Sequence, residues 1–343
     1  MKRIILKGPD FCAVEEDRVL VEYLRIEETG QSGDILLGTV ERIMPGLGCA
    51  FVNIGRKKAG FLPLQENSQT FSGPPLKSGM KIPVQIRKEE HDGKGAFLTR
   101  DPALAGKYIL LMPLNRHIGV SGRIPDGEEK ERLRDMGRRA AEGRTGIVLR
   151  SAATAAEMGE LAAETEELLQ KWEAVLEGMK NVSESGAVLF HQDPVAQLIS
   201  DYESRGIDEI RETEMIPQEL EKQLREAENR RIPLRSGGNI VIDRCEAMTV
   251  IDVNTGSAAG GNGKDSTFLE TNLEACRAAA AQIRLRNLAG IIVIDFIDMN
   301  TEQDRESVEK ELQELLKADR RKTVIHGWTR LGLMEITRKR TGG

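Results

Sequence analysis

Two aspartates stand inside apolar, β-type runs of the sequence. Asp252 lies in TVIDVNTG, residues 249–256, and Asp295 lies in IIVIDFIDM, residues 291–299. An ionised carboxylate is unfavourable in an apolar strand unless a partner or a cation compensates it. Side chains alternate along a strand, so Asn254 shares a face with Asp252. These three residues are therefore the first candidates for chemistry.

Each of the two aspartates lies at the carboxyl end of its predicted strand. One predicted helix separates the two strands in the sequence. Open α/β layers bind ligands outside the carboxyl ends of their strands. If the two strands are neighbours, the carboxylates of Asp252 and Asp295 converge and repel each other unless a cation lies between them. Oxygen ligands without histidine or cysteine favour Mg²⁺ or Mn²⁺ over zinc. Such a metal could activate water against a phosphodiester, with Asn254 orienting the water or a phosphate oxygen.

Of two other interpretations of these segments, a capping role stays open and a phosphate-binding loop is excluded. A strand-end aspartate also serves as a turn or helix cap, and Asp298 is a candidate for that role. The loop GSAAGGNG, residues 256–263, is glycine-rich, but it does not fit a phosphate-binding P-loop. Gly263–Lys264 is followed by Asp265 instead of Ser or Thr, and Ala258 holds the place of the earlier glycine. A nucleotide-hydrolysing enzyme is therefore not expected.

The elements that must position these residues begin with short strands. Residues 19–28 alternate as a strand does, and residues 35–100 contain about five short β-type runs separated by glycine turns. That pattern predicts a small β-barrel.

The middle of the chain is mixed. We expect helices at Glu128–Gly143 and Ala156–Lys180, with a strand at Gly146–Thr154 between them. After a strand near residues 187–193, further helices are expected to about Arg230. RIPLRSGGN, residues 231–239, is expected to be a boundary loop.

The last block alternates between strands and helices. GNIVIDRC and AMTVIDVN predict two paired strands, and a helix over residues 265–288 precedes the strand at 291–299. A second helix at 301–322 and a final strand or helix follow. This β–α–β–α order predicts an α/β layer.

Composition restricts the class of protein. The 343 residues are 39% hydrophobic and 30% charged, which indicates a soluble protein of two or more domains. No run approaches the roughly 18 apolar residues of a membrane span, and no secretory signal is expected at the N-terminus. Four scattered cysteines predict reduced thiols and a cytoplasmic location. The net charge of −6 opposes a wholly basic nucleic-acid surface, although local basic clusters occur.

Four long motifs, in order and covering nearly the whole chain, resemble the bacterial ribonuclease E/G family. They are ILLGTVERIMPGLGCAFVNIGRKKAGFLPL, IVIDRCEAMTVIDVNTG, TNLEACRAAAAQIRLRNLAGIIVIDFIDM and GLMEITRKR. The resemblance implies an endoribonuclease of RNA processing and mRNA decay. Such an enzyme cuts single-stranded, often A/U-rich RNA and prefers a 5′-monophosphate end.

The resemblance also implies an α+β and α/β fold of several subdomains. These are an RNase H-like subdomain at 1–34 and 181–230, an inserted S1 domain (an OB-fold β-barrel) at 35–104, a 5′-sensor region at 105–180 and a DNase I-like catalytic subdomain at 231–343.

The resemblance assigns roles at the two strand ends. The family's two metal-binding aspartates fall on Asp252 and Asp295, and its catalytic-site asparagine falls on Asn254. Lys322 falls where the family has a basic residue near the active site. The expected cofactor is Mg²⁺, with Mn²⁺ possible.

The resemblance assigns RNA contacts in the predicted barrel. Phe51 and Phe61 match aromatic residues that contact RNA, and Arg56 flanks them. Exposed aromatics on an OB-type barrel stack bases without strict sequence preference. Lys94 is a further candidate phosphate contact. The alternative is that one or both phenylalanines belong to the barrel core.

For the 5′-phosphate, GIVLRSAA resembles the family segment in which an arginine and the next hydroxyl residue hold the terminal phosphate. Arg150 and Ser151 occupy those places, with serine where the family usually has threonine. Val120 is a candidate backbone donor. The alternative for Arg150 is an ordinary ion pair.

One departure from the family concerns zinc. Family members carry a CPxC-type motif just beyond TRKR that links two subunits through zinc, and this sequence ends at Gly343 before any such motif. Zinc is therefore not predicted, and the family's homodimer is expected to be weakened or lost. The alternative to an enzyme is a non-catalytic S1-type RNA-binding protein, because the barrel alone would bind single-stranded RNA.

Overall fold

The computed structural model describes residues 2–26, 31–64, 70–90, 94–125, 127–203, 205–255 and 264–339, with side chains from residue 268 in the last range. The chain forms two compact units. The first joins Met1–Ile26 to Arg205–Arg340, and the second spans Glu27–Ser204.

A small sheet of the first unit joins the three N-terminal strands to one strand from much later in the chain. Its strand order is β14-β1-β2-β3, with α4 packed against it. The region of β14 was predicted to be helical, and that prediction is wrong. The segment EIRE carries no apolar periodicity, and pairing with β1 in the parallel direction makes it a strand. The elements are β1 (Arg3–Lys7), β2 (Phe11–Glu16), β3 (Val19–Arg25), β14 (Glu209–Glu212) and α4 (Gln218–Glu226).

A larger, six-stranded sheet completes the first unit, in the order β15-β16-β17-β18-β20-β19. The predicted hairpin of β16 and β17 is confirmed. The predicted boundary loop at 231–239 is partly wrong, because its first residues pair with β16 as an edge strand. The strands are β15 (Arg231–Pro233), β16 (Asn239–Arg244), β17 (Met248–Asn254), β18 (Gly290–Asp295), β19 (Thr323–Trp328) and β20 (Met334–Arg338).

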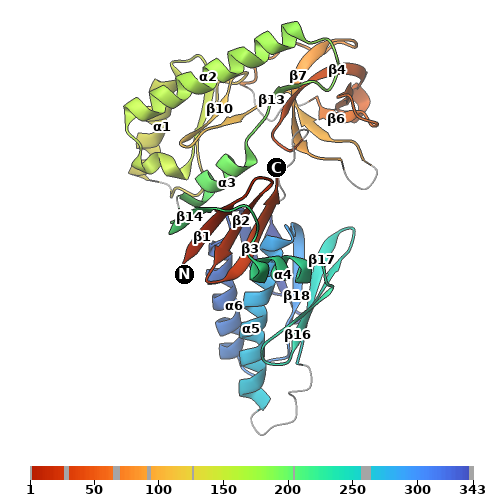
Figure 1. The fold of residues 1–343 in the computed structure, drawn as a ribbon, viewed down its shortest axis with the longest axis vertical. Coiled ribbons are helices and arrows are strands. Elements are labelled where there is room, and N and C mark those ends of the chain that lie inside the picture. Colours follow the sequence, from red (N-terminus) through yellow and green to blue (C-terminus); the bar gives the residue numbers. More distant parts are fainter. Residues whose placement is uncertain are drawn as a thin grey trace. The chain divides into compact units, whose positions relative to one another are not determined.

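Two helices cover one face of this sheet. They are α5 (Lys264–Leu285) and α6 (Glu302–Lys317), which lie side by side against the strands (Figure 1). Ile251, Ile292 and Ile294 face them and are fully buried together with residues of both helices. Burial of each such aliphatic side chain contributes about 1.5–3 kcal/mol to the stability of the folded state. The other face of the sheet is therefore the one on which polar side chains can stand.

The second unit contains a closed five-stranded barrel, as the sequence predicts. Its strands follow the order β4-β5-β6-β8-β7, and β7 pairs back to β4. A sixth strand, β13, adds to the outer edge of β4. The elements are β4 (Ile35–Met44), the 3₁₀ helix η1 (Pro45–Leu47), β5 (Cys49–Asn53), β6 (Gly60–Pro63), β7 (Lys81–Lys88), β8 (Phe97–Thr99) and β13 (Val188–Phe190).

A four-stranded sheet, in the order β11-β12-β10-β9, lies beside two helices in the same unit. The predicted strand at 146–154 ends at Leu149 and continues as a 3₁₀ helix, so that prediction is only half right. The elements are β9 (Leu104–Ala105), β10 (Ile109–Met112), β11 (Ile118–Val120), α1 (Glu128–Ala141), β12 (Gly146–Leu149), η2 (Ser151–Ala155), α2 (Met158–Asn181) and α3 (Pro194–Glu203).

The architecture is a mixed α+β fold of several subdomains, as expected. Within the described residues, no helix combines the length and the apolar character that crossing a membrane requires.

Candidate active site

Asp252 and Asp295 are neighbours on the open face of the six-stranded sheet. Strands β17 and β18 run parallel, and their register pairs Asp252 with Asp295. Adjacent strands lie about 4.8 Å apart, and residues in register on them point to the same face. Both aspartates are exposed, whereas Ile251 and Ile294 beside them point into the helix-covered core. The carboxylates thus interrupt apolar strands without being buried.

The two carboxylates influence each other electrostatically. Partial burial, the charge of Asp252 and the charge of Asp298 all raise the pKa of Asp295 above its ordinary value. Each cause disfavours the ionised form of Asp295. A divalent cation at this place would reverse the effect.

Asn254 is tied to the same pair. Its Nδ2 donates a hydrogen bond of 2.7 Å to Oδ2 of Asp252, and the residue is half-buried at the end of β17. Gly238 lies against its main chain, because a Cβ at that position would approach the carbonyl oxygen of Asn254 to 2.5 Å. The amide therefore fixes the orientation of one carboxylate while its own Oδ1 remains an acceptor.

A residue that the sequence did not single out holds the segment after Asp295. Asn272 on α5 is fully buried, and its side chain spans the main chain of Ile297. Nδ2 donates to the Ile297 carbonyl at 2.9 Å, and Oδ1 accepts from the Ile297 N–H at 3.0 Å. The sequence signal was only a polar residue on the core face of a predicted helix. Asn272 thereby fixes the chain between Asp295 and Asp298.

Asp298 is not the cap of α6. Thr301 takes that position and accepts a hydrogen bond of 3.1 Å from the N–H of Asp304. Asp298 is exposed, and its effect is the negative charge that it adds near Asp295.

The donor set suits a hard cation. Asp252 and Asp295 offer carboxylate oxygens and Asn254 offers an amide oxygen, with no thiolate or imidazole among them. Across the part of the chain that the structure describes, no group of three or more His, Cys, Asp or Glu side chains could enclose a metal. Mg²⁺ binds through one or two carboxylates and keeps waters or substrate phosphates for its other positions. The residues therefore fit Mg²⁺ or Mn²⁺ better than zinc.

The structure does not bring Lys322 to this pair. It is exposed just before β19, where its carbonyl pairs with Lys339 at the far end of β20. Arg338, the residue before Lys339, pairs in register with Gly290 on β18. Gly290 is five residues before Asp295. Five residues of strand span about 16 Å, which exceeds the reach of a lysine side chain. The glycine loop after Thr255 lies outside the described residues.

Phe51 and Phe61 face each other across neighbouring barrel strands. They pair in register on β5 and β6, with ring centroids 6.3 Å apart in an edge-to-face arrangement. Both are partly exposed, so they are not core residues of the barrel. Arg56 lies in the β5–β6 loop, and Lys94 is exposed before β8.

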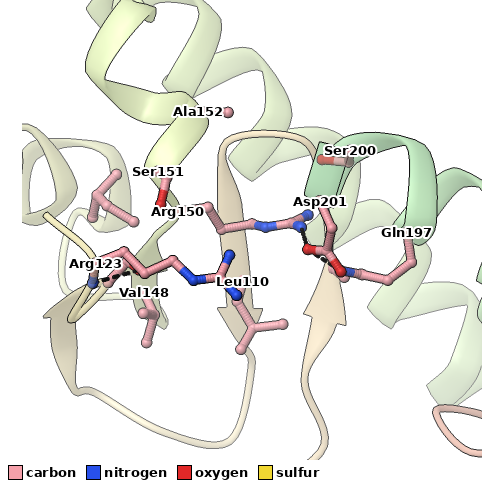
Figure 2. Close-up of a pocket in the computed structure, with 12 residues that line it drawn as sticks. Leu110, Arg123, Val148, Arg150, Ser151, Ala152, Gln197, Ser200 and Asp201 are labelled. Atoms are coloured by element: carbon pink, nitrogen blue, oxygen red, sulfur yellow. Dashed lines mark hydrogen bonds and ion pairs between the residues drawn. The ribbon is translucent and has the colours of Figure 1, made fainter. Parts of the chain in front are cut away.

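A cavity of about 230 Å³ surrounds the predicted phosphate-binding residues (Figure 2). Arg150 and Ser151 both line it, at the junction of β12 and η2. Nη2 of Arg150 contacts Oδ1 of Asp201 on α3 at 2.6 Å, and the two side chains are 16% and 17% exposed. The Nη1 atom donates to the carbonyl of Gly106. Arg150 is therefore oriented by an ion pair inside the cavity, and its binding of a terminal phosphate stays a prediction.

Two lining residues were missed by the sequence reasoning. Asp201, which also accepts from Gln197 at 3.2 Å, gave no sequence signal apart from its charge. Arg123 supplies a second guanidinium that extends toward Leu110 in Figure 2. Val120 does not line the cavity, although the next residue, Ser121, does.

Comparison with known protein families gives the class of protein to which the chain is similar. The family model described as "Ribonuclease E/G family" matches residues 103–215 and 211–341. The chain belongs to the ribonuclease E/G family.

Particular relatives extend the match to nearly the whole chain. Ribonuclease G of Escherichia coli K12 is 35% identical, with 95% of this chain and 76% of the relative covered. Ribonuclease G of Haemophilus influenzae is 34% identical over 94% of this chain and 75% of the relative. Ribonuclease E of the same organism is 33% identical over 99% of this chain and 42% of its own length.

Proposed function

We propose that the chain is a Mg²⁺-dependent endoribonuclease that cleaves single-stranded RNA. The family membership supports the endoribonuclease activity. The observation that carries the metal dependence is the in-register pair of Asp252 and Asp295 on the open face of the sheet.

The residues at the strand ends have separate roles in this proposal. The carboxylates of Asp252 and Asp295 hold a divalent cation, which supplies Lewis-acid activation of water and charge stabilisation at the scissile phosphate when it is bound. Asn254 holds the Asp252 carboxylate in one orientation through its 2.7 Å hydrogen bond. Its Oδ1 can accept a hydrogen bond from a hydroxyl group of the substrate or from water. Asn272 acts as a positioning residue for the segment after Asp295.

The barrel binds the substrate in this proposal and corresponds to an S1 domain of the OB type. The partly exposed rings of Phe51 and Phe61 suit base stacking, which requires unpaired bases and tolerates any base. That explains a preference for single strands, and A/U-rich RNA is the least structured kind.

The cavity around Arg150 receives the 5′-monophosphate in this proposal. A phosphate monoester offers several acceptor oxygens to a guanidinium and a hydroxyl, whereas a 5′-hydroxyl offers neither charge nor acceptors of that strength. Arg150 and Ser151 supply these donors, and Arg123 adds positive potential. Arg150 is already paired with Asp201. A bound phosphate must therefore either displace the Asp201 carboxylate or share the guanidinium with it.

A cleavage assay tests the proposal. One A/U-rich RNA is prepared with a 5′-monophosphate and with a 5′-hydroxyl, and each is incubated with the protein with and without Mg²⁺. We expect cleavage only with Mg²⁺, and faster cleavage of the monophosphorylated RNA. Asp252→Asn and Asp295→Asn should each abolish cleavage while RNA binding persists. Full activity in either variant would rule out the carboxylate mechanism.

The barrel phenylalanines favour a second candidate, a non-catalytic RNA-binding protein. That protein would bind RNA in a salt-dependent manner. It would give no metal-dependent products in the same assay, so the assay separates the two candidates.

A further inference from the structure

Five residues form one continuous row across the strands of the barrel. Each residue is paired in register with the next, from β4 through β5, β6 and β8 to β7. In that order they are Arg42, Phe51, Phe61, Phe97 and Lys88, and we name them the phenylalanine row. Phe97 and the two cations at its ends had no part in the sequence prediction of RNA binding.

The row stands on the outside of the barrel. Each phenylalanine is partly exposed and is followed in the sequence by a buried aliphatic residue. Side chains alternate along a strand, so those aliphatic residues fill the barrel and the rings point outward. The buried neighbours are Val52, Leu62 and Leu98, all members of the barrel core.

The three rings touch in succession. Phe51 and Phe61 meet edge to face at 6.3 Å between centroids, and Phe61 and Phe97 lie nearly parallel at 5.6 Å with 27° between their planes. Cross-strand aromatic contacts alone could account for a pair. A row of three partly exposed rings presents more apolar surface than a single pair does, and contiguous apolar surfaces mark binding sites.

A cation stands at each end of the row. The guanidinium of Arg42 lies 5.5 Å from the Phe51 ring centroid, and Nζ of Lys88 lies 5.5 Å from that of Phe97. An anionic chain with flat apolar groups at regular intervals matches both parts of this surface. Single-stranded RNA has that chemistry, because its bases stack on aromatic faces while its phosphates seek cations.

We infer that Phe97 is a third base-stacking position of the RNA-binding surface, beside Phe51 and Phe61, and that Arg42 and Lys88 contact the phosphates at its two ends. The inference rests on the proposed binding of single-stranded RNA and extends the site across the whole row. The ligand is a run of unpaired nucleotides, and a duplex whose bases are stacked on each other cannot use the rings.

The test is a binding measurement on the full chain. Fluorescence anisotropy follows an A/U-rich 12-nucleotide RNA with a 5′-hydroxyl, so that the cavity around Arg150 gains no phosphate. The buffer contains a chelator, and gel electrophoresis afterwards verifies that the RNA is intact. Phe97→Leu is expected to weaken binding by roughly fivefold to 150-fold, the range for loss of one stacked base. Binding of the corresponding RNA duplex should change by less than twofold.

Phe71→Leu is the matched control. Phe71 is also partly buried and lies under a cation, Arg100, at 4.6 Å, but it is outside the row. We expect its substitution to change RNA affinity by less than twofold. Equal effects of Phe71→Leu and Phe97→Leu, or no effect of Phe97→Leu, would overturn the inference.

Two further variants separate stacking from a structural role. Phe97→Trp keeps an aromatic face and should retain affinity, and its added tryptophan fluorescence should be quenched by RNA relative to the wild type. Arg42→Gln and Lys88→Gln should each lower the slope of log affinity against log salt by about 0.7, whereas Phe97→Leu should leave that slope unchanged. Loss of binding in Phe97→Trp, with a normal unfolding temperature, would contradict the stacking role.

The outcome is independent of catalysis. If RNA binds through the row but is never cut in the presence of Mg²⁺, the proposed endonuclease fails and the row stands. If cleavage depends on Asp295 while Phe97→Leu binds normally, the row fails and the nuclease stands.

Discussion

Replacing Asp295 with asparagine should weaken Mg²⁺ binding about 100-fold. The substitution keeps the size and shape of the side chain and removes one of the two charges that converge at the ends of β17 and β18. Because Asp295 is exposed, the change should leave the surrounding core undisturbed.

The magnitude follows from Coulomb's law. A divalent cation about 3 Å from a carboxylate charge gains about 2.8 kcal/mol in a medium as polar as water, which is appropriate for an exposed site. About 1.4 kcal/mol corresponds to a factor of ten, so that loss is about 100-fold in affinity. The mutual repulsion of the carboxylates is nearly the same with and without metal when both are ionised, and it cancels from this difference.

Asp298→Asn provides the matched control. Asp298 also raises the pKa of Asp295 by its charge, but it lies outside the register pair. At an assumed separation of about 8 Å the same relation gives about 1 kcal/mol, or at most about fivefold, before salt screening.

The assay is direct Mn²⁺ binding at pH 7.5, measured by electron paramagnetic resonance, because this readout does not depend on the cleavage activity that Asp295→Asn is expected to lose. Asp295→Asn should shift the Mn²⁺ dissociation constant far more than Asp298→Asn does. Similar shifts for the two variants, or an unchanged constant in Asp295→Asn, would refute the assignment of the pair as the metal site.

Three other predictions follow from single contacts. Arg150→Gln should remove the preference for a 5′-monophosphate over a 5′-hydroxyl while cleavage of 5′-hydroxyl RNA stays within about threefold, as measured by paired rate constants. Glu16 is buried between Arg3 and Arg284, and although burial raises its pKa, the hydrogen bonds and charges of Arg284 and Arg3 hold it below the ordinary value. Its stabilisation is therefore present above the unfolded-state pKa and lost as pH falls through the folded-state pKa. Glu16→Gln should cost about 3–5 kcal/mol in urea unfolding at pH 7, with the difference from wild type shrinking in acid. Asn272→Leu leaves two main-chain groups without partners and should cost about 2–4 kcal/mol and slow cleavage, whereas a stable variant with full activity would contradict its positioning role.

Local patterns were sufficient for much of the fold. The closed barrel, the hairpin of β16 and β17, and the two long helices α5 and α6 each follow from periodicity and glycine turns within a short window. The strands β14 and β15 did not, because they are short and polar and become strands only by pairing with β1 and β16.

The candidate site was predictable in part. Asp252 and Asp295 could be predicted because a carboxylate at the end of an apolar run is visible in the sequence. Asn272 was not, because an asparagine on a helix reveals nothing until the chain it bonds is known. The same holds for Asp201, whose partner Arg150 is 51 residues away.

The sequence by itself determined which residue types stand at the ends of β17 and β18, because alternation along a strand depends only on neighbouring residues. Tertiary structure alone decided which of them meet. The parallel register of β17 and β18 brings Asp252 beside Asp295, and the pairing of β6 with β8 aligns Phe97 with Phe61. Contacts between residues far apart in the chain depend on strand order and register, and one residue of slip would turn each side chain to the opposite face of its sheet.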